Sequence, residues 1–268
     1  MDLYLSSKIL FDRQIETVIE LIVERGYDGL ELWSEHFLNL GYRDPLAQSE
    51  LIELLREAPF PLWIHGPTMD LNITSANPRV AQVSLEENIR AIELAHLLEA
   101  KGVVIHPGSL SAPINDVEME EYWDRQLAAL RRLARAADCL LAVENMESRD
   151  NNFIQEPSDL KRILENIPRS NLGICFDIAH SRSLGNTEEF LEKMAPDITH
   201  IHYSNSGTKS IHAPIDRGES NLPQPFLSFL EDFSGVLTFE GRDPAREREV
   251  AENYLDLFLQ TCERSCSC

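Results

Sequence analysis

Strand-like and helix-like segments alternate along almost the whole chain of 268 residues, and this alternation constrains the fold most strongly. Eight short apolar runs have the length of β-strands, and they span residues 3–5, 29–33, 62–65, 103–106, 140–144, 172–177, 198–202 and 236–240. Between them, apolar residues recur every three or four positions, as in Leu85, Ile89 and Ile92, which is typical of amphipathic helices. Eight such strand–helix units in a chain of this length predict a single (β/α)8 barrel.

A doubly wound open sheet would show the same alternation of segments. That fold usually carries a glycine-rich G-x-G-x-x-G turn after its first strand, and no such turn follows residues 3–5. No low-complexity linker or break in composition marks a second domain, so we predict one barrel domain over residues 1–260. Residues 261–268 form a predicted C-terminal tail with Cys262, Cys266 and Cys268, which we interpret as a frayed terminus rather than a soft-metal site.

The charge balance bears on the partners of the chain. There are 24 basic and 45 acidic residues, which gives a net charge of −21. This balance disfavours extended nucleic-acid binding, because such proteins usually present a basic face, although a local basic groove stays open. No apolar run approaches the roughly 20 residues that span a bilayer. The start of the chain lacks a basic region followed by an apolar core, and the cysteine count of five is odd, so we expect a cytoplasmic protein without membrane association.

The polar residues at the ends of the apolar runs indicate the functional site. Seven of the eight runs carry a histidine or a carboxylate at or near their end, namely Glu31, His65, His106, Glu144, Asp177, His202 and Glu240. Burying such a group costs on the order of several kcal/mol unless it is paired or bound to a metal. In a parallel barrel the C-terminal ends of the strands open on one face, which holds the active site. Nitrogen and oxygen donors that converge there predict a site for Zn²⁺, Mn²⁺ or a similar divalent ion.

Five short motifs in series resemble those of a known superfamily. They are Ile64-His65-Gly66-Pro67, Ile105-His106-Pro107-Gly108, Val143-Glu144-Asn145, Phe176-Asp177-Ile178-Ala179-His180 and His200-Ile201-His202. Together they resemble the xylose isomerase-like TIM barrels, which include sugar and sugar-phosphate isomerases and epimerases and also endonuclease IV. The resemblance extends from Leu3 to Glu240 in the correct order.

The isomerase and epimerase branch implies one divalent metal held by Glu144, Asp177, His202 and Glu240. In such enzymes the metal polarises a carbonyl and a hydroxyl of the sugar, and two glutamates remove and return a proton on the adjacent carbon. The resemblance therefore implies that Glu144 and Glu240 are the catalytic residues. It also implies a small-molecule substrate, either a sugar or a sugar phosphate.

The endonuclease IV branch implies three zinc ions and a metal-dependent phosphodiester hydrolase. His65 and His106 match its first-zinc histidines, and His180 and His212 match ligands of its third zinc. Ser210 stands where that third site has an aspartate, and an alternative register would place Asp216 in that role. In either register one ligand of the third site is missing, so the resemblance favours one or two ions over three.

These observations leave three functions open. The first is a metal-dependent isomerase or epimerase, and the second is a phosphodiester hydrolase that acts on abasic-site DNA or a smaller diester. The third is a barrel that binds metal or ligand without catalysis. Around the site, we predict a structural hydrogen bond for Glu31 and a place in the barrel interior for His200, which shares a strand face with His202. The long stretch 203–235 is expected to shape the site.

Overall fold

The computed structural model describes residues 1–11, 14–113, 115–205, 211–215 and 222–265. It confirms the predicted fold, because eight parallel strands form a closed barrel in which each strand pairs with its neighbours in chain order. The strands are β1 (Asp2–Ser6), β2 (Gly29–Trp33), β3 (Leu62–His65), β4 (Gly102–Ile105), β5 (Leu140–Glu144), β6 (Leu172–Asp177), β7 (Ile198–Tyr203) and β8 (Val236–Phe239). β1 pairs with β8, which closes the barrel and leaves no exposed strand edge.

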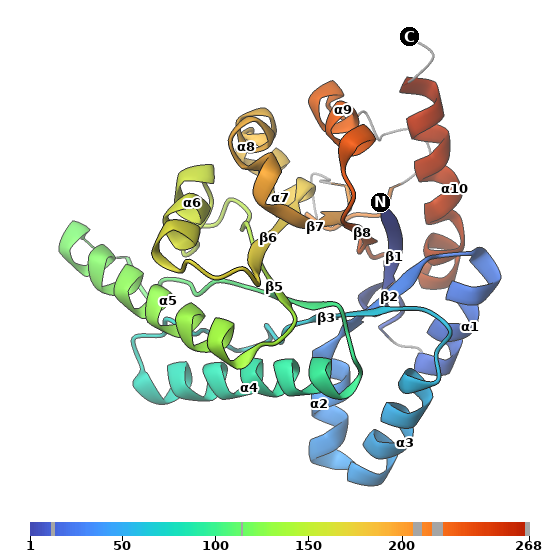
Figure 1. Cartoon of the computed structure of the whole chain (residues 1–268), viewed down its shortest axis with the longest axis horizontal. Helices are drawn as coiled ribbons and strands as arrows, with labels where there is room; N and C mark the ends of the chain where they lie inside the picture. The colour runs from blue at the N-terminus through green and yellow to red at the C-terminus, as the bar shows by residue number, and fades with distance from the viewer. Residues whose placement is uncertain (12–13, 114, 206–210, 216–221, 266–268) are drawn as a thin grey trace.

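Helices surround the strands, as Figure 1 shows. They are α1 (Ile15–Arg25), α2 (Ser34–Arg43), α3 (Pro45–Arg56), α4 (Pro78–Leu97), α5 (Asp116–Ala136), α6 (Pro157–Asn166), α7 (Ile178–Leu184), α8 (Thr187–Met194), α9 (Gln224–Asp232) and α10 (Glu247–Ser265), with short 3₁₀ helices at η1 (Ser7–Leu10) and η2 (Ala195–Asp197). Local sequence signals set their starts; Asn115, for example, caps α5 and forms a capping box with Glu118. Among the described residues, no helix is both long and apolar enough to cross a membrane.

Two apolar cores hold the barrel together. The larger lies between the strands and the surrounding helices, and α1 and α10 meet side by side over it (Figure 1). The smaller fills the barrel interior with Tyr4, Trp63, Val104, Ala142, Cys175 and Val236. Since successive side chains of a strand point to opposite faces, the residue two positions after each of these also points inward. The interior therefore changes from apolar to polar toward the C-terminal ends of the strands.

The structure corrects the predicted tail boundary. Residues 261–265 are not a separate tail, because α10 continues to Ser265. The apolar face of the helix explains this extension, since Phe258 is buried and Cys262 packs against the same core. Cys266 and Cys268 lie outside the described residues.

Candidate metal centre

Four inward-pointing side chains meet at the C-terminal mouth of the barrel. Glu144 and Asp177 are the last residues of β5 and β6, His202 is the penultimate residue of β7, and Glu240 directly follows β8. All four are at most 1% exposed. The parallel register places Asp177 beside His202 on neighbouring strands. Strand alternation and barrel closure thus bring together the four residues that the isomerase branch implies.

His202 lies at the centre of this group. Its Nδ1 atom is 3.1 Å from Glu144 Oε1 and 3.7 Å from Glu240 Oε2. Single donor atoms of Asp177, His202 and Glu240 all lie within 4.8 Å of one another. A four-coordinate metal site has ligands about 2 Å from the ion, so atoms this close can share one ion after small side-chain movements.

Two further histidines face Glu144 from β3 and from the residue after β4. His106 Nε2 lies 2.9 Å from Glu144 Oε2, and His65 Nε2 lies 3.7 Å from the same oxygen. The two imidazole centroids are 5.1 Å apart, which lies below the limit of about 7 Å for two ligands of one ion. Donor atoms of His65, Glu144 and His202 form a second compact group.

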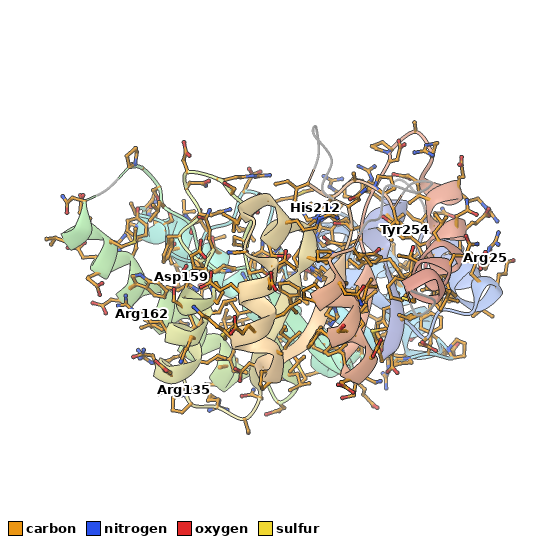
Figure 2. All side chains as sticks on the ribbon, turned by 90° about the horizontal axis from the view of Figure 1, so that it is seen from above. Arg25, Arg135, Asp159, Arg162, His212 and Tyr254 are labelled. Atoms are coloured by element: carbon orange, nitrogen blue, oxygen red, sulfur yellow. The ribbon has the colours of Figure 1, made fainter. Side chains whose placement is uncertain are left out.

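His180 and His212 form the opposite side of the centre. Their Nε2 atoms are 3.2 Å apart, and His212 Nδ1 is 2.6 Å from Glu240 Oε1. Donor atoms of Asp177, His180 and His212 make a third compact group. Figure 2 shows His212 toward one edge of the molecule and Arg135, in the last turn of α5, toward the opposite edge. All eight residues that the sequence proposes as ligands therefore line one face.

Backbone carbonyls orient two of these histidines. His65 Nδ1 is 2.8 Å from the carbonyl oxygen of Gly66, and His180 Nδ1 is 2.7 Å from that of Asn145. A carbonyl oxygen only accepts, so both Nδ1 atoms carry the proton and donate it. The unprotonated Nε2 atoms then face the centre, which is the arrangement that metal-binding histidines need.

The carboxylates of the centre differ in their affinity for protons. Burial raises the pKa of Glu144, but His106 and His202 outweigh burial and hold that pKa well below its usual value. Burial likewise raises the pKa of Glu240, and His212, Lys8 and His202 together lower it well below its usual value. Asp177 behaves oppositely, because burial and the charges of Glu240 and Glu144 raise its pKa well above 3.8. Asp177 therefore holds its proton to a higher pH than Glu144 and Glu240 do.

Asp177 also supplies the test of whether a metal fits this centre. Its Oδ2 atom is fully buried and has no hydrogen-bond partner among the described residues. The Nε2 atom of His180 and the Nδ1 atom of His212 lie 3.7 and 3.8 Å away, beyond hydrogen-bond distance. A buried carboxylate oxygen of this kind costs free energy unless it gains a partner. A divalent cation fits the position, since its charge and the nitrogen and oxygen donors complement each other.

Sequence reasoning missed Lys8, which reaches the same mouth from η1. Its ammonium group lies 3.3 Å from Glu240 Oε2 and 5.7 Å from the centroid of the Trp33 ring. Strand alternation applies to Tyr4 and Ser6 in β1, but Lys8 follows in a 3₁₀ helix, where the period of two no longer holds. Glu147 was also missed; it is buried, and its Oε2 atom lies 3.6 Å from His180 Nε2.

Other predicted positions have mixed outcomes. Glu31 forms the predicted buried hydrogen bonds, and His200 lies in the barrel interior. Ser210 and Asp216, between which the sequence left the third-site aspartate open, lie outside the described residues. The structure therefore gives no position for either of them.

Comparison with known proteins identifies the family. A family model described as xylose isomerase-like TIM barrel matches residues 19–261, which is most of the chain. The chain belongs to this family. The resemblance that the sequence motifs indicate is thus confirmed.

Relatives within and around the family differ in activity. The uncharacterized protein MJ1311 of Methanocaldococcus jannaschii is 29% identical over 263 residues, covering 94% of this chain and 88% of the relative. The crystal structure of a D-tagatose 3-epimerase-like protein is 27% identical with a TM-score of 0.76, covering 97% of this chain and 99% of the other. A probable endonuclease 4 of Mycobacterium leprae is 25% identical over 144 residues, which is 54% of each chain. Sugar epimerases and endonuclease IV-like enzymes are thus both among its relatives.

Proposed function

We propose that this protein is a divalent-metal-dependent isomerase or epimerase of a small sugar or sugar phosphate. The observation that carries the proposal is the pair of carboxylates, Glu144 and Glu240, which approach His202 Nδ1 from β5 and from the end of β8. Their surroundings hold the pKa of each well below its usual value. Such a pair can serve as bases on two sides of one substrate carbon. The likeness over nearly the full length to the D-tagatose 3-epimerase-like structure supports the same reaction class.

The side chains of the centre have complementary roles in this reaction. Glu144, Asp177, His202 and Glu240 would hold a divalent ion, and the ion would supply polarisation of the substrate carbonyl. One glutamate removes the proton from the carbon next to that carbonyl, and the other returns a proton. For an epimerase the proton returns to the opposite face of the carbon. For an isomerase it returns to the neighbouring carbon.

Neighbouring side chains lower the pKa of both bases. His106, 2.9 Å from Glu144 Oε2, lowers the pKa of that carboxylate. His212 and Lys8 do the same for Glu240. Both carboxylates are almost fully buried. We propose one or two ions, Zn²⁺ or Mn²⁺, rather than three.

A phosphodiester hydrolase is the second candidate, and a specific observation favours it. The His65–His106 and His180–His212 pairs supply more nitrogen donors than one ion needs, and they form compact groups with Glu144 and Asp177. Two close metal ions are suited to in-line attack on phosphorus. The probable endonuclease 4 of Mycobacterium leprae supports this reading, although the match covers about half of that protein.

Isotope incorporation separates the two candidates. The metal-loaded protein is incubated in D₂O with a panel of ketoses and ketose phosphates, and each sugar is then examined by NMR. We expect deuterium at the carbon next to the carbonyl, because a carboxylate base exchanges its proton with solvent between turnovers. In a parallel reaction in H₂¹⁸O, abasic-site DNA and small diesters are tested for ¹⁸O in the phosphomonoester product. Label in the phosphomonoester, with no exchange on any sugar, would overturn the proposal and support the hydrolase.

A further inference from the structure

Glu31 occupies an unusual position below the metal centre. Its strand, β2, is not a neighbour of β7 in the barrel, yet its carboxylate crosses the interior to reach two histidines of β7. Glu31 Oε2 is 2.9 Å from His200 Nε2 and 3.1 Å from His202 Nε2. All three side chains are fully buried.

The two ring nitrogens of His202 have different partners. Nε2 faces Glu31, while Nδ1 faces Glu144 and Glu240 in the metal centre. The Glu31 carboxylate can only accept a hydrogen bond, so Nε2 of His202 carries the proton and donates it. Nδ1 is then the nitrogen that can bind an ion. His65 and His180 show the same division, but a backbone carbonyl is the acceptor and Nε2 faces the centre.

We infer that Glu31 is a positioning residue that fixes His202 as an Nδ1 ligand and strengthens its bond to the divalent ion. This inference rests on the metal site of the proposed function. A carboxylate that accepts the outer N–H of a ligand imidazole orients the ring and makes the ligand nitrogen more basic. His200 contributes by donating to the same oxygen, which holds the Glu31 side chain toward His202.

Glu35 provides a matched control from the same region of the chain. It is also a buried glutamate, but it binds the loop after β3 through the backbone N–H of Met69, at 2.6 Å, and the hydroxyl of Thr68, at 3.0 Å. None of the contacts described for Glu35 or His202 joins these two residues. Glu35→Gln therefore reports the general cost of removing a buried carboxylate near the barrel mouth.

The first experiment measures Zn²⁺ affinity by competition with a chromophoric chelator. Glu31→Gln should weaken Zn²⁺ binding by about 10-fold or more, in the range found when a carboxylate behind a metal-binding histidine is lost. Glu35→Gln should stay within about twofold of wild type. Equal Zn²⁺ affinity in wild type and Glu31→Gln, or equal weakening in both variants, would overturn the inference.

The second experiment needs no variant of Glu31 and decides the matter if Glu31→Gln fails to fold. ¹⁵N-histidine NMR of the Zn²⁺-loaded wild type should show His202 protonated at Nε2 and zinc-bound at Nδ1. Zinc on Nε2, or no proton on Nε2, would overturn the inference. Failure of the proposed function is distinguishable, because Zn²⁺ affinity and this spectrum do not depend on turnover.

Discussion

At the scale of single residues, Asp177 has two roles that one substitution can separate. Its Oδ1 atom accepts the backbone N–H of His180 at 2.8 Å and caps α7, while Oδ2 faces the metal centre. Asp177→Asn keeps an N-cap residue but removes the carboxylate that would bind a metal, whereas Asp177→Ala also loses about 1 kcal/mol of capping. We expect Asp177→Asn to lose most bound metal, as measured by elemental analysis, without losing the fold.

Asp159 is the matched control for that prediction. It also accepts backbone N–H groups at the start of a helix, and burial also raises its pKa. Figure 2 shows Asp159 on a different part of the molecule from His212. Asp159→Asn should therefore retain full metal content. Full metal content in Asp177→Asn as well would contradict the assignment of Asp177 as a ligand.

The pKa values of Asp177 and His202 predict how metal binding depends on pH. Asp177 has a raised pKa. The pKa of His202 is also raised well above 6.5, since Cys175, Glu31 and Glu144 together outweigh the lowering effect of burial. A metal ion must displace these protons, so Zn²⁺ affinity should fall as pH falls. Adding Zn²⁺ to weakly buffered protein should release protons, and Asp177→Asn should release fewer. Binding that is independent of pH between 6 and 8 (about the range where histidines titrate) would be inconsistent with this account.

In the metal-free protein, Asp177 should make the free energy of unfolding decrease as pH rises. This is the reverse of the pH dependence expected for Zn²⁺ affinity. The folded state keeps a proton on Asp177 that the unfolded chain loses above about pH 3.8. The contribution of Asp177 to the free energy of unfolding is therefore fully present below that pH. It is lost as pH rises through the raised pKa.

The limits of sequence reasoning are also clearest at this scale. Strand-end position was sufficient to predict that Glu144, Asp177 and His202 meet at the barrel mouth, because alternation and barrel closure fix where such residues point. Lys8 lies beyond the end of β1 in a 3₁₀ helix, so no apolar run marked it. The contact from Glu31 to β7 crosses the barrel, and no local pattern encodes which side chains meet there.

At the scale of elements, α10 fixes the chain around the metal centre. The hydroxyl of Tyr254 donates to the carbonyl oxygen of Gly241 at 3.0 Å and accepts the backbone N–H of Ile215 at 3.3 Å. These bonds join the residue after Glu240 to the segment that carries His212, and Figure 2 shows Tyr254 and His212 toward the same edge. A Cβ at position 241 would clash with the Tyr254 hydroxyl and with the backbone of Ala213, so this close approach requires Gly241.

Tyr254→Phe tests this link between a helix and the site. Both hydrogen bonds are lost, and the free energy of unfolding should fall by about 1–3 kcal/mol, since the two backbone groups stay buried without partners. The segment around His212 should then be held less firmly, which should also weaken Zn²⁺ binding. Denaturant unfolding and Zn²⁺ affinity measure the two effects. Wild-type stability and affinity together would show that α10 does not hold the site.

Element boundaries show why the fold was easier to predict than the tail. The apolar runs at 29–33, 62–65, 140–144 and 172–177 coincide with strands because buried parallel strands are continuously apolar. β4 and β8 end one residue earlier than expected, just before His106 and Glu240. The end of α10 was missed because a polar, cysteine-containing sequence gave no sign that Cys262 continues an apolar face.

At the scale of the whole molecule, metal binding should raise thermal stability. An ion that binds only the folded state stabilises it by about 2.7 kcal/mol at 100 times its dissociation constant. For a chain of this size that corresponds to a rise in Tm of about 5–10 °C. A thermal melt with and without Zn²⁺ measures the rise, and Asp177→Asn should lose most of it. An equal rise in that variant would place the ion elsewhere.

The central claim is that the strand-end residues form a divalent metal centre, and a metal count per chain tests it most directly. The wild-type protein is purified without chelator, exposed to excess Zn²⁺ or Mn²⁺, dialysed and analysed for metal and protein content. We predict one to two ions per chain in the wild type and a loss of most metal in Asp177→Asn. A wild-type protein that retains no divalent metal would contradict the account.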